Sequence, residues 1–182
     1  MRRMAMPAVP EEVFDVVDEA DRVIGSAPRS EVHRRKLRHR AVHVLLFNAR
    51  AELFVQKRSA TKDTFPGCYD SSASGHLNSG EDYDICAVRE VQEELGLLIP
   101  IGRLSRHFKV EACEETGWEF VWVYSAVTDE QPRIDLTELE SGDFWTLEHT
   151  RSLLRVSPEQ FAPSFVQIFD EFDRRGLLPR KP

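Results

Sequence analysis

The sequence predicts an α/β domain in which a mixed β-sheet lies between layers of helices. Short apolar and β-branched runs, separated by turn-forming residues, recur along the chain in the manner of strands. The segment between Asp82 and Gly96 has the apolar spacing of an amphipathic helix, and aromatic residues near the C-terminus recur at the same spacing. Strands and helices mixed in this order are typical of a layered α/β/α domain.

The N-terminal part predicts a β-hairpin followed by a short helix. Residues 13–17 and 22–27 have strand character, and the turn formers of residues 18–21 lie between them. Ser30 is expected to cap a short basic helix that ends near residue 37. Residues 1–10 contain no apolar stretch of signal-peptide length, so we expect a disordered start.

The middle of the chain predicts the main sheet. Residues 41–48 form a mostly apolar strand, and residues 52–57 return after a turn. Residues 63–69 contain Pro66-Gly67 and are expected to form a loop. The remaining expected strands are residues 71–76, 103–111, 119–127 and a short one at Phe144-Trp145.

The C-terminal part predicts two helices, residues 148–154 and 158–174. An apolar face of the second helix is expected to pack in the core; it comprises Phe161, Phe165, Ile168, Phe169 and Phe172. The 182 residues suit one domain. We expect the hairpin and short helix within residues 11–37, the core within residues 38–155 and the C-terminal helix within residues 156–182.

Composition narrows the function classes. A net charge of −7 argues against a protein that covers duplex nucleic acid with a broad basic surface. No apolar run approaches the roughly 20 residues that cross a bilayer. The three cysteines are widely spaced and form no Cys-x-x-Cys pair, which indicates reduced thiols and a cytoplasmic protein. A small phosphorylated substrate is compatible with the negative charge, because a bound metal reverses the local sign. A homodimer stays open.

The most informative segment is residues 75–97, GHLNSGEDYDICAVREVQEELGL. Asp82 is suited to cap a helix that begins at Tyr83, and Gly96 is suited to end it. One face of this helix is apolar and carries Val88, Val91 and Leu95. The opposite side gathers Glu90, Glu93 and Glu94 within roughly 100° of arc.

Three carboxylates on one side of a helix repel each other, which makes them a poor choice for a solvated face. A hard divalent cation removes this conflict, because magnesium prefers oxygen ligands and bridges carboxylates to phosphates. Gly75 lets the backbone come close to such an ion and offers its carbonyl oxygen. The segment therefore predicts a magnesium site, with manganese as a substitute.

The same segment resembles the Nudix box, G-x5-E-x7-R-E-U-x-E-E-x-G-U, where U is a bulky aliphatic residue. Every specified position is filled, by Gly75, Glu81, Arg89, Glu90, Val91, Glu93, Glu94, Gly96 and Leu97. The resemblance implies a Nudix-type α/β/α sandwich and a hydrolase that cleaves a phosphoric anhydride, most simply of a nucleoside di- or triphosphate. Residues 38–41, 56–58 and 62–67 are similar to the Nudix branch related to type 1 isopentenyl-diphosphate isomerase.

The resemblance also implies roles for individual residues. Glu90, Glu93 and Glu94 would hold the metal with the Gly75 carbonyl, Glu90 or a group outside the box would act as base, and Arg89 would be held by Glu81. A later carboxylate, Glu138 or Glu140, would reach the metal. Lys57, Arg58 and Lys62 are expected to contact the phosphates, and a surface role is equally compatible with them. A base-stacking wall is open for Phe65, Tyr69, Trp118 and Trp122, although such side chains are more often part of a core.

Two other functions stay open. In an isomerase-like site, His33, His39 and His76 would bind a metal with Glu119, but Ser74 stands where the isomerases have a cysteine and Gly117 where they have an acidic ligand. A surface or phosphate-facing role is expected for His33 and His39, which lie in a basic run, and a metal site is the alternative. The third class, a non-catalytic nucleotide-binding sensor, would usually lose a metal carboxylate, and this chain has lost none.

Overall fold

The computed structural model describes residues 11–180, so the expected disordered start over residues 1–10 lies outside the described part. Its centre is a mixed seven-stranded sheet with the order β5-β4-β3-β8-β7, in which β6 also pairs with β3 and β9 with β4. Only β3 and β8 run parallel among these pairs. The strands are β3 His39–Phe47, β4 Glu52–Arg58, β5 Tyr69–Asp70, β6 Ala73–His76, β7 Ser105–Val110, β8 Glu119–Val127 and β9 Leu139–Thr146.

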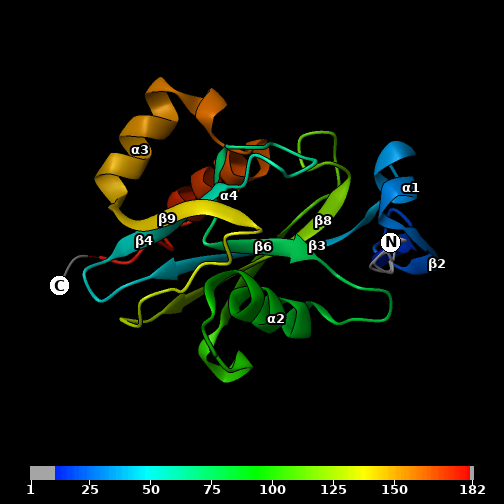
Figure 1. The fold of residues 1–182 in the computed structure, drawn as a ribbon, viewed down its shortest axis with the longest axis horizontal. Helices are drawn as coiled ribbons and strands as arrows, with labels where there is room; N and C mark the ends of the chain where they lie inside the picture. Colours follow the sequence, from blue (N-terminus) through cyan, green and yellow to red (C-terminus); the bar gives the residue numbers. More distant parts are fainter. Residues whose placement is uncertain (1–10, 181–182) are drawn as a thin grey trace, which may run out of the picture.

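Helices cover both faces of this sheet, which confirms the predicted α/β/α sandwich (Figure 1). Helix α2, Tyr83–Leu95, lies on one face, and α3, Leu147–Val156, and α4, Pro163–Arg174, lie on the other. Alternate residues of β3 point to the two layers. Val42, Val44 and Leu46 pack with residues of α2, whereas Ala41, Leu45 and Phe47 pack with residues of α4. Full burial of each large side chain contributes about 1.5–3 kcal/mol.

The N-terminal hairpin was predicted correctly. Strands β1, Val13–Val17, and β2, Val23–Pro28, form a separate antiparallel pair beside α1, Arg29–Arg34. The prediction that Ser30 caps the helix was wrong, because the helix begins at Arg29 and the Ser30 N–H donates to the Glu11 carboxylate over 2.6 Å. The helix also ends before residue 37, since Lys36 adopts a left-handed φ of 52°.

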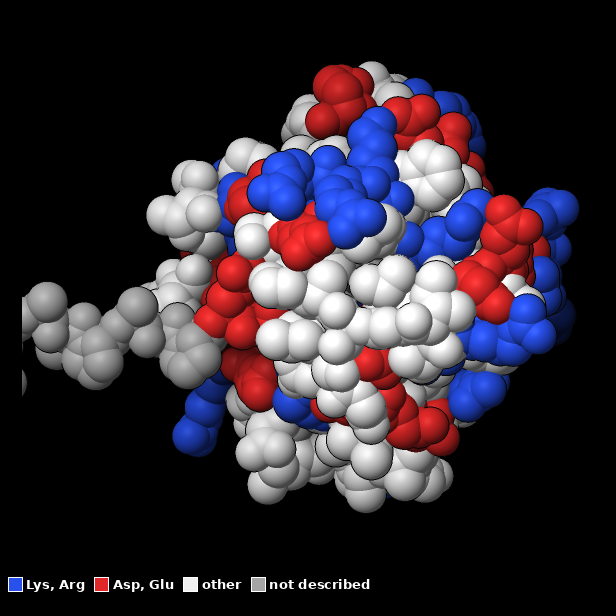
Figure 2. All heavy atoms as spheres, turned by 90° about the vertical axis from the view of Figure 1, so that its right-hand side faces the viewer, with Lys and Arg blue, Asp and Glu red and all other residues white. Residues whose placement is uncertain are grey.

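Figure 2 shows the side of the molecule on which the hairpin and α1 lie. Charged groups of both signs surround an uncharged area there. No helix within residues 11–180 combines the length and the apolar character needed to cross a bilayer.

Helix α2 has the predicted ends. The Asp82 side chain accepts a hydrogen bond from the Asp84 N–H at 2.7 Å, and Gly96 closes the helix with a left-handed φ of 64°. Helix α4, in contrast, begins at Pro163 rather than at residue 158. Pro158–Gln160 form a 3₁₀ turn, and the Ala162 N–H donates to the Tyr69 carbonyl. Proline lacks an N–H and so suits the first helical turn. The expected apolar face, with Phe161 now outside the helix, is buried.

Strand β6 positions the site. β3 pairs with β4 only at Phe47 and Leu53, and residues 41–44 of β3 pair with β6 instead. The two longer strands therefore diverge toward the residue 41 end of β3. Residues of β3, β4 and β6 meet the helix α2 carboxylates at this end, where they line a common cavity.

Candidate active site

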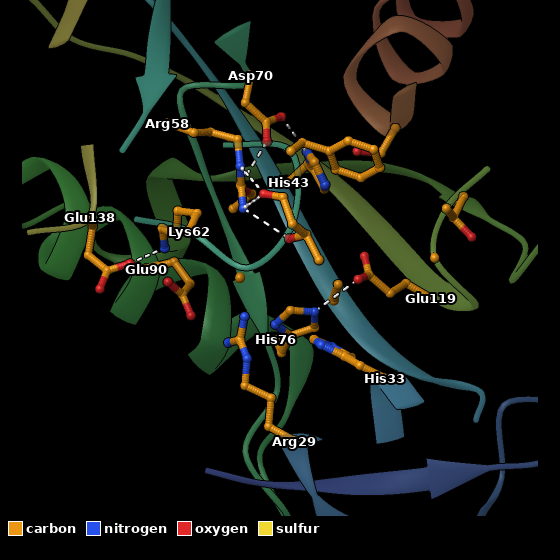
Figure 3. A pocket seen from close by; sticks show the side chains of 18 of the residues that line it. Arg29, His33, His43, Arg58, Lys62, Asp70, His76, Glu90, Glu119 and Glu138 are labelled. Atoms are coloured by element: carbon orange, nitrogen blue, oxygen red, sulfur yellow. Dashed lines mark hydrogen bonds and ion pairs between the residues drawn. The ribbon is translucent and has the colours of Figure 1, made fainter. Parts of the chain in front are cut away.

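The cavity has a volume of about 640 Å³ and brings together three kinds of side chain (Figure 3). In Figure 3, Glu90 and Glu138 lie near Lys62, whereas His33 and His76 lie near Glu119. The carboxylates are Glu90, Glu93, Glu94 and Glu138, the second group is His33, His76 and Glu119, and the cations are Arg29, Arg58, Lys62 and Arg89.

Glycine at position 75 makes room for the helix carboxylates. A Cβ on Gly75 would lie 2.1 Å from the carboxyl carbon of Glu90, so only glycine leaves that carboxylate in place. Glu94, one turn later on α2, accepts hydrogen bonds from the Ser74 N–H at 3.1 Å and from the Gln56 amide at 3.4 Å. Strand β6 and helix α2 thus meet at two buried carboxylates.

Burial disfavours the ionised forms of these two carboxylates. Burial raises the pKa of Glu94 to about 8, and the neighbouring Glu90 charge adds to the shift. Burial also raises the pKa of Glu90 to about 7, although Arg89 opposes the shift. Buried, closely spaced carboxylate oxygens fit a hard divalent cation, which would favour their ionised forms.

Arg89 connects the box residues. Its guanidinium donates to both oxygens of Glu81 at 2.8 Å, to Glu90 at 2.6 Å and to Glu93 at 2.9 Å. It also donates to the carbonyl of His76 over 2.9 Å, which ties the helix to the end of β6. The expected support of Arg89 by Glu81 is therefore present as a bidentate ion pair.

The two later carboxylates differ in position. Glu138 lines the cavity and forms an ion pair with Lys62. Glu140 pairs with Lys57 over 2.8 Å, and neither of these two residues is among those that line the cavity. The structure thus brings Glu138, rather than Glu140, to the box carboxylates.

Only some of the expected substrate-binding residues line the cavity. Arg58, Lys62 and Phe65 line the cavity, as does Trp118. Tyr69 does not, because its ring packs edge-on against Trp145 at a centroid distance of 4.8 Å. Trp122 also lies outside the cavity lining and stacks under the Arg106 guanidinium, whose central carbon is 3.9 Å from the ring centroid. The four expected aromatic groups therefore do not form one wall.

The histidines form a compact cluster. Ligand atoms of His33, His39, His76 and Glu119 all lie within 4.8 Å of one another, although the residues come from four different elements. His76 Nε2 is 2.9 Å from a Glu119 oxygen. The surface or phosphate-facing role expected for His39 was wrong: its side chain is fully buried and its Nε2 has no hydrogen-bond partner.

This cluster has the chemistry of a metal site. Burial, together with the neighbouring imidazoles, lowers the pKa of His33 to about 4, and burial also lowers the pKa of His76. Neutral imidazoles keep the lone pairs that bind metals. The unpartnered Nε2 of His39 beside a carboxylate fits the same role, because a bound cation would satisfy it.

One polar network in the cavity wall was not predicted. His43 Nδ1 lies 2.7 Å from the Ser71 hydroxyl, and Asp70 accepts from Arg58 over 3.1 Å. The available signal was a histidine inside the apolar run of residues 41–48, followed later by three consecutive polar residues at 70–72. His43, Asp70 and Ser71 are buried, and nothing in the local sequence pattern indicates this.

Comparisons with known proteins identify the family of this chain. The family model described as NUDIX domain matches residues 37–167. An uncharacterized Nudix hydrolase of Pseudomonas aeruginosa is 38% identical over 78% of this chain and 85% of its own. A prenyl-diphosphate phosphatase of Methanosarcina mazei is 31% identical over 85% of this chain and 94% of its own.

Two further similarities complete the comparison. An isopentenyl-diphosphate Delta-isomerase 2 of Photorhabdus laumondii is 28% identical over 88% of this chain and 92% of its own. A crystal structure of a Deinococcus radiodurans protein superposes with a TM-score of 0.72 and 29% identity, covering 90% of this chain and 98% of that one.

Proposed function

The chain belongs to the NUDIX domain family and is a Nudix hydrolase, and we propose that it uses a divalent metal and water to cleave the phosphoric anhydride of a nucleoside di- or triphosphate. One observation carries the proposal. Glu90 is buried at the space that Gly75 leaves, and Glu94 is buried beside Ser74, in the same cavity as Arg58 and Lys62. Carboxylates for a metal and cations for phosphates are the two requirements of such a reaction.

The proposed metal ligands are Glu90, Glu93, Glu94 and the carbonyl oxygen of Gly75, with Glu138 as a further carboxylate. Magnesium, or manganese in its place, would neutralise phosphate oxygens and polarise the attacked phosphorus when bound. Arg89 would hold Glu90 and Glu93 in place before the metal binds, through the contacts described above. Glu138 replaces Glu140 in this assignment, because only Glu138 lines the cavity.

The substrate is proposed to lie along the cations of the cavity. Arg58 and Lys62 would bind the phosphates that do not react, and both line the cavity. Phe65 and Trp118 would contact the organic group, and they replace the four-residue wall. Lys57 and Tyr69 have no part in this assignment, since other side chains of the protein occupy them.

A release assay tests the proposal. The protein is incubated with magnesium and a panel of nucleoside di- and triphosphates, sugar nucleotides and isoprenyl diphosphates, and phosphate and pyrophosphate are measured. Turnover should need the metal and stop with a chelator. Full turnover in metal-free buffer would contradict the metal role, and binding without product across the panel would favour a nucleotide sensor.

The histidine cluster favours one second candidate, an isomerase acting on isopentenyl diphosphate. Four metal-capable groups meet there, as described, and one relative carries that name. The serine at position 74 argues against it, since a hydroxyl is a far weaker acid than a thiol. We expect no deuterium uptake into isopentenyl diphosphate in deuterated water, followed by NMR. Ser74→Cys alone should not create uptake, because Gly117 also departs from the isomerase pattern.

Three further properties remain to be tested with the proposed function. We propose that the enzyme acts in the cytoplasm, in keeping with its unpaired cysteines. Whether two copies associate is measured directly by light scattering on the purified chain. The single-domain organisation, with the hairpin, core and C-terminal helix as one unit, is tested by one cooperative unfolding transition.

A further inference from the structure

One histidine in the cavity wall has no part in the functions proposed above. His43 lies in the middle of β3, opposite Ser74 of β6, and it lines the cavity. Its side chain is 5% exposed. What a buried neutral imidazole can do depends on which of its two nitrogens carries the proton, because one is then a donor and the other an acceptor.

The neighbours of His43 decide this assignment. Nδ1 lies 2.7 Å from the Ser71 hydroxyl and 3.7 Å from an Asp70 oxygen. The Ser71 hydroxyl has two acceptors of its own, the Asp70 carboxylate at 3.4 Å and the Ala73 carbonyl at 3.3 Å. A hydroxyl has one proton to donate, so its lone pair is left for an N–H of His43. These acceptors favour the tautomer with the imidazole proton on Nδ1, which is the first step of the inference.

Hydrogen bonds hold the Asp70 carboxylate next to Ser71 and His43, where it favours a proton on Nδ1. One of its oxygens accepts from the Ser71 N–H at 2.7 Å, and the other accepts from Arg58 at 3.1 Å. In Figure 3, Asp70 lies between Arg58 and His43. Because Arg58 is itself bound to the Thr64 carbonyl, the arrangement is anchored to the loop beyond β4.

The second ring nitrogen is then an acceptor. Within residues 11–180, Nε2 of His43 makes no hydrogen bond, and the side chain borders the cavity. Burial lowers the pKa of His43, although Asp70 on β5 and Glu119 on β8 oppose the shift, and Arg58 on β4 adds to it. The ring is therefore neutral at ordinary pH and keeps the lone pair of Nε2.

From these contacts we propose that His43 accepts a hydrogen bond from an O–H group in the cavity, either the attacking water or a hydroxyl of the substrate. The inference rests on the hydrolysis proposed above. Phosphate oxygens are excluded as the partner, because they are acceptors themselves and have Arg58 and Lys62 in the same cavity. His43 would thus bind a hydrogen-bond donor, which Arg58 and Lys62 cannot do because they only donate.

If the donor is water, the step balances as follows. The water oxygen forms a bond to phosphorus while the bridging P–O bond breaks, and its electron pair leaves with the departing phosphate. One water proton passes to Nε2 of His43 and from there to solvent. If the donor is a substrate hydroxyl, no proton is transferred and the contact selects substrates that carry that hydroxyl.

Two matched variants separate these cases. His43→Asn keeps an N–H near the Nδ1 position and removes the acceptor, whereas His43→Gln can place an amide oxygen near the Nε2 position. His107→Asn is the control, since His107 also bonds a serine hydroxyl at 2.7 Å but does not line the cavity. Activity is measured with magnesium on paired ribo- and deoxyribonucleotides.

For water as the donor, His43→Asn should lower kcat at least about 100-fold on every substrate. For a substrate hydroxyl, it should raise KM about fivefold on the ribonucleotide alone, with recovery in His43→Gln. Rates and KM within twofold of the parent on each pair would overturn the inference, as would an equal loss in His107→Asn. Absence of any turnover by the parent would instead overturn the proposed function, and the catalytic role with it.

A measurement on the unaltered protein covers the case in which the buried variants do not fold. ¹⁵N-detected NMR of the imidazole resonances reports which nitrogen is protonated. The expected result is a neutral ring with the proton on Nδ1. A proton on Nε2 would overturn the acceptor assignment whatever the activity.

Discussion

Gly75 and Glu90 are matched to each other, because the Glu90 carboxylate fills the space that a Cβ at position 75 would need. The nearest oxygen of Glu90 would lie 2.1 Å from that Cβ. The carboxylate is the far end of a flexible side chain and can move aside, so the fold itself does not require glycine here. Glycine at position 75 is therefore needed to keep the Glu90 carboxylate in its place, not to keep the fold.

Gly75→Ala should consequently separate activity from stability. The displaced Glu90 carboxylate would lose its place as a proposed metal ligand, and the loss of one such interaction costs about 10²–10³ in rate. We expect kcat with magnesium to fall by about two orders of magnitude, with a melting temperature close to that of the parent. Gly25→Ala is the matched control, since a Cβ there has no neighbour within 4 Å. A parental rate in Gly75→Ala would remove Glu90 from the metal site.

Glu93→Gln tests the role of the exposed carboxylate of the box. The side chain is 58% exposed and pairs with Arg89, which Glu81 holds independently. We expect kcat to fall by at least about 100-fold, because a charged metal ligand is lost. Without metal the melting temperature should stay level or rise, as repulsion among the three carboxylates is relieved.

Glu130→Gln is the control for that substitution, because Glu130 is exposed and lies outside the cavity lining. It should keep the parental rate. Unfolding of Glu93→Gln would show that the helix carboxylates are structural, and an unchanged rate would show that Glu93 holds no catalytic metal.

The buried carboxylates predict a pH dependence of stability in metal-free buffer. Their pKa values in the folded protein, about 8 for Glu94 and about 7 for Glu90, lie above the ordinary value of 4.5. The unfolded chain releases these protons first, so the stability present below pH 4.5 is lost as the pH rises through 7 and 8.

The melting temperature in a chelator should therefore fall between about pH 5 and pH 9, by at least about 4 °C. Glu94→Gln should flatten this fall, whereas Glu130→Gln should keep the parental slope. Magnesium should restore stability at high pH, because it binds the ionised carboxylates. A flat profile for the parent would show that the two carboxylates are not held protonated by burial.

Local signals predicted the parts of the fold that depend on local chemistry. Helix α2 begins after Asp82 and ends at Gly96 as expected, because a capping carboxylate and a left-handed glycine act within one turn. The predicted starts of α1 and α4 were wrong because contacts distant in sequence set them. At α1, the Ser30 N–H donates to the Glu11 carboxylate. A backbone bond from Ala162 to Tyr69, distant in sequence, holds the chain extended before Pro163.

In the site, too, the features set by local sequence were predicted and those set by distant contacts were not. The box residues could be placed from one segment, since they share a single helix and the strand before it. The histidine cluster needs four elements to meet, and the basic run around His33 and His39 suggested surface positions instead. Whether Glu138 or Glu140 faces the cavity was likewise beyond the sequence, because it depends on how β9 pairs with β4, where the register shifts at Lys57 and Arg58.

The contacts of Arg89 make metal loading an exchange of counterions. One nitrogen of its guanidinium bonds both Glu90 and Glu93, so an arriving cation must displace an existing positive charge rather than fill a bare negative site. Glu81 binds the other nitrogens of the guanidinium, so Arg89 would stay nearby after a metal displaced it from Glu90 and Glu93. The apparent affinity for the proposed metal would therefore be set by a competition between that cation and Arg89 for the same carboxylates. Shortening Glu81 to Asp should shift that competition without touching a proposed ligand.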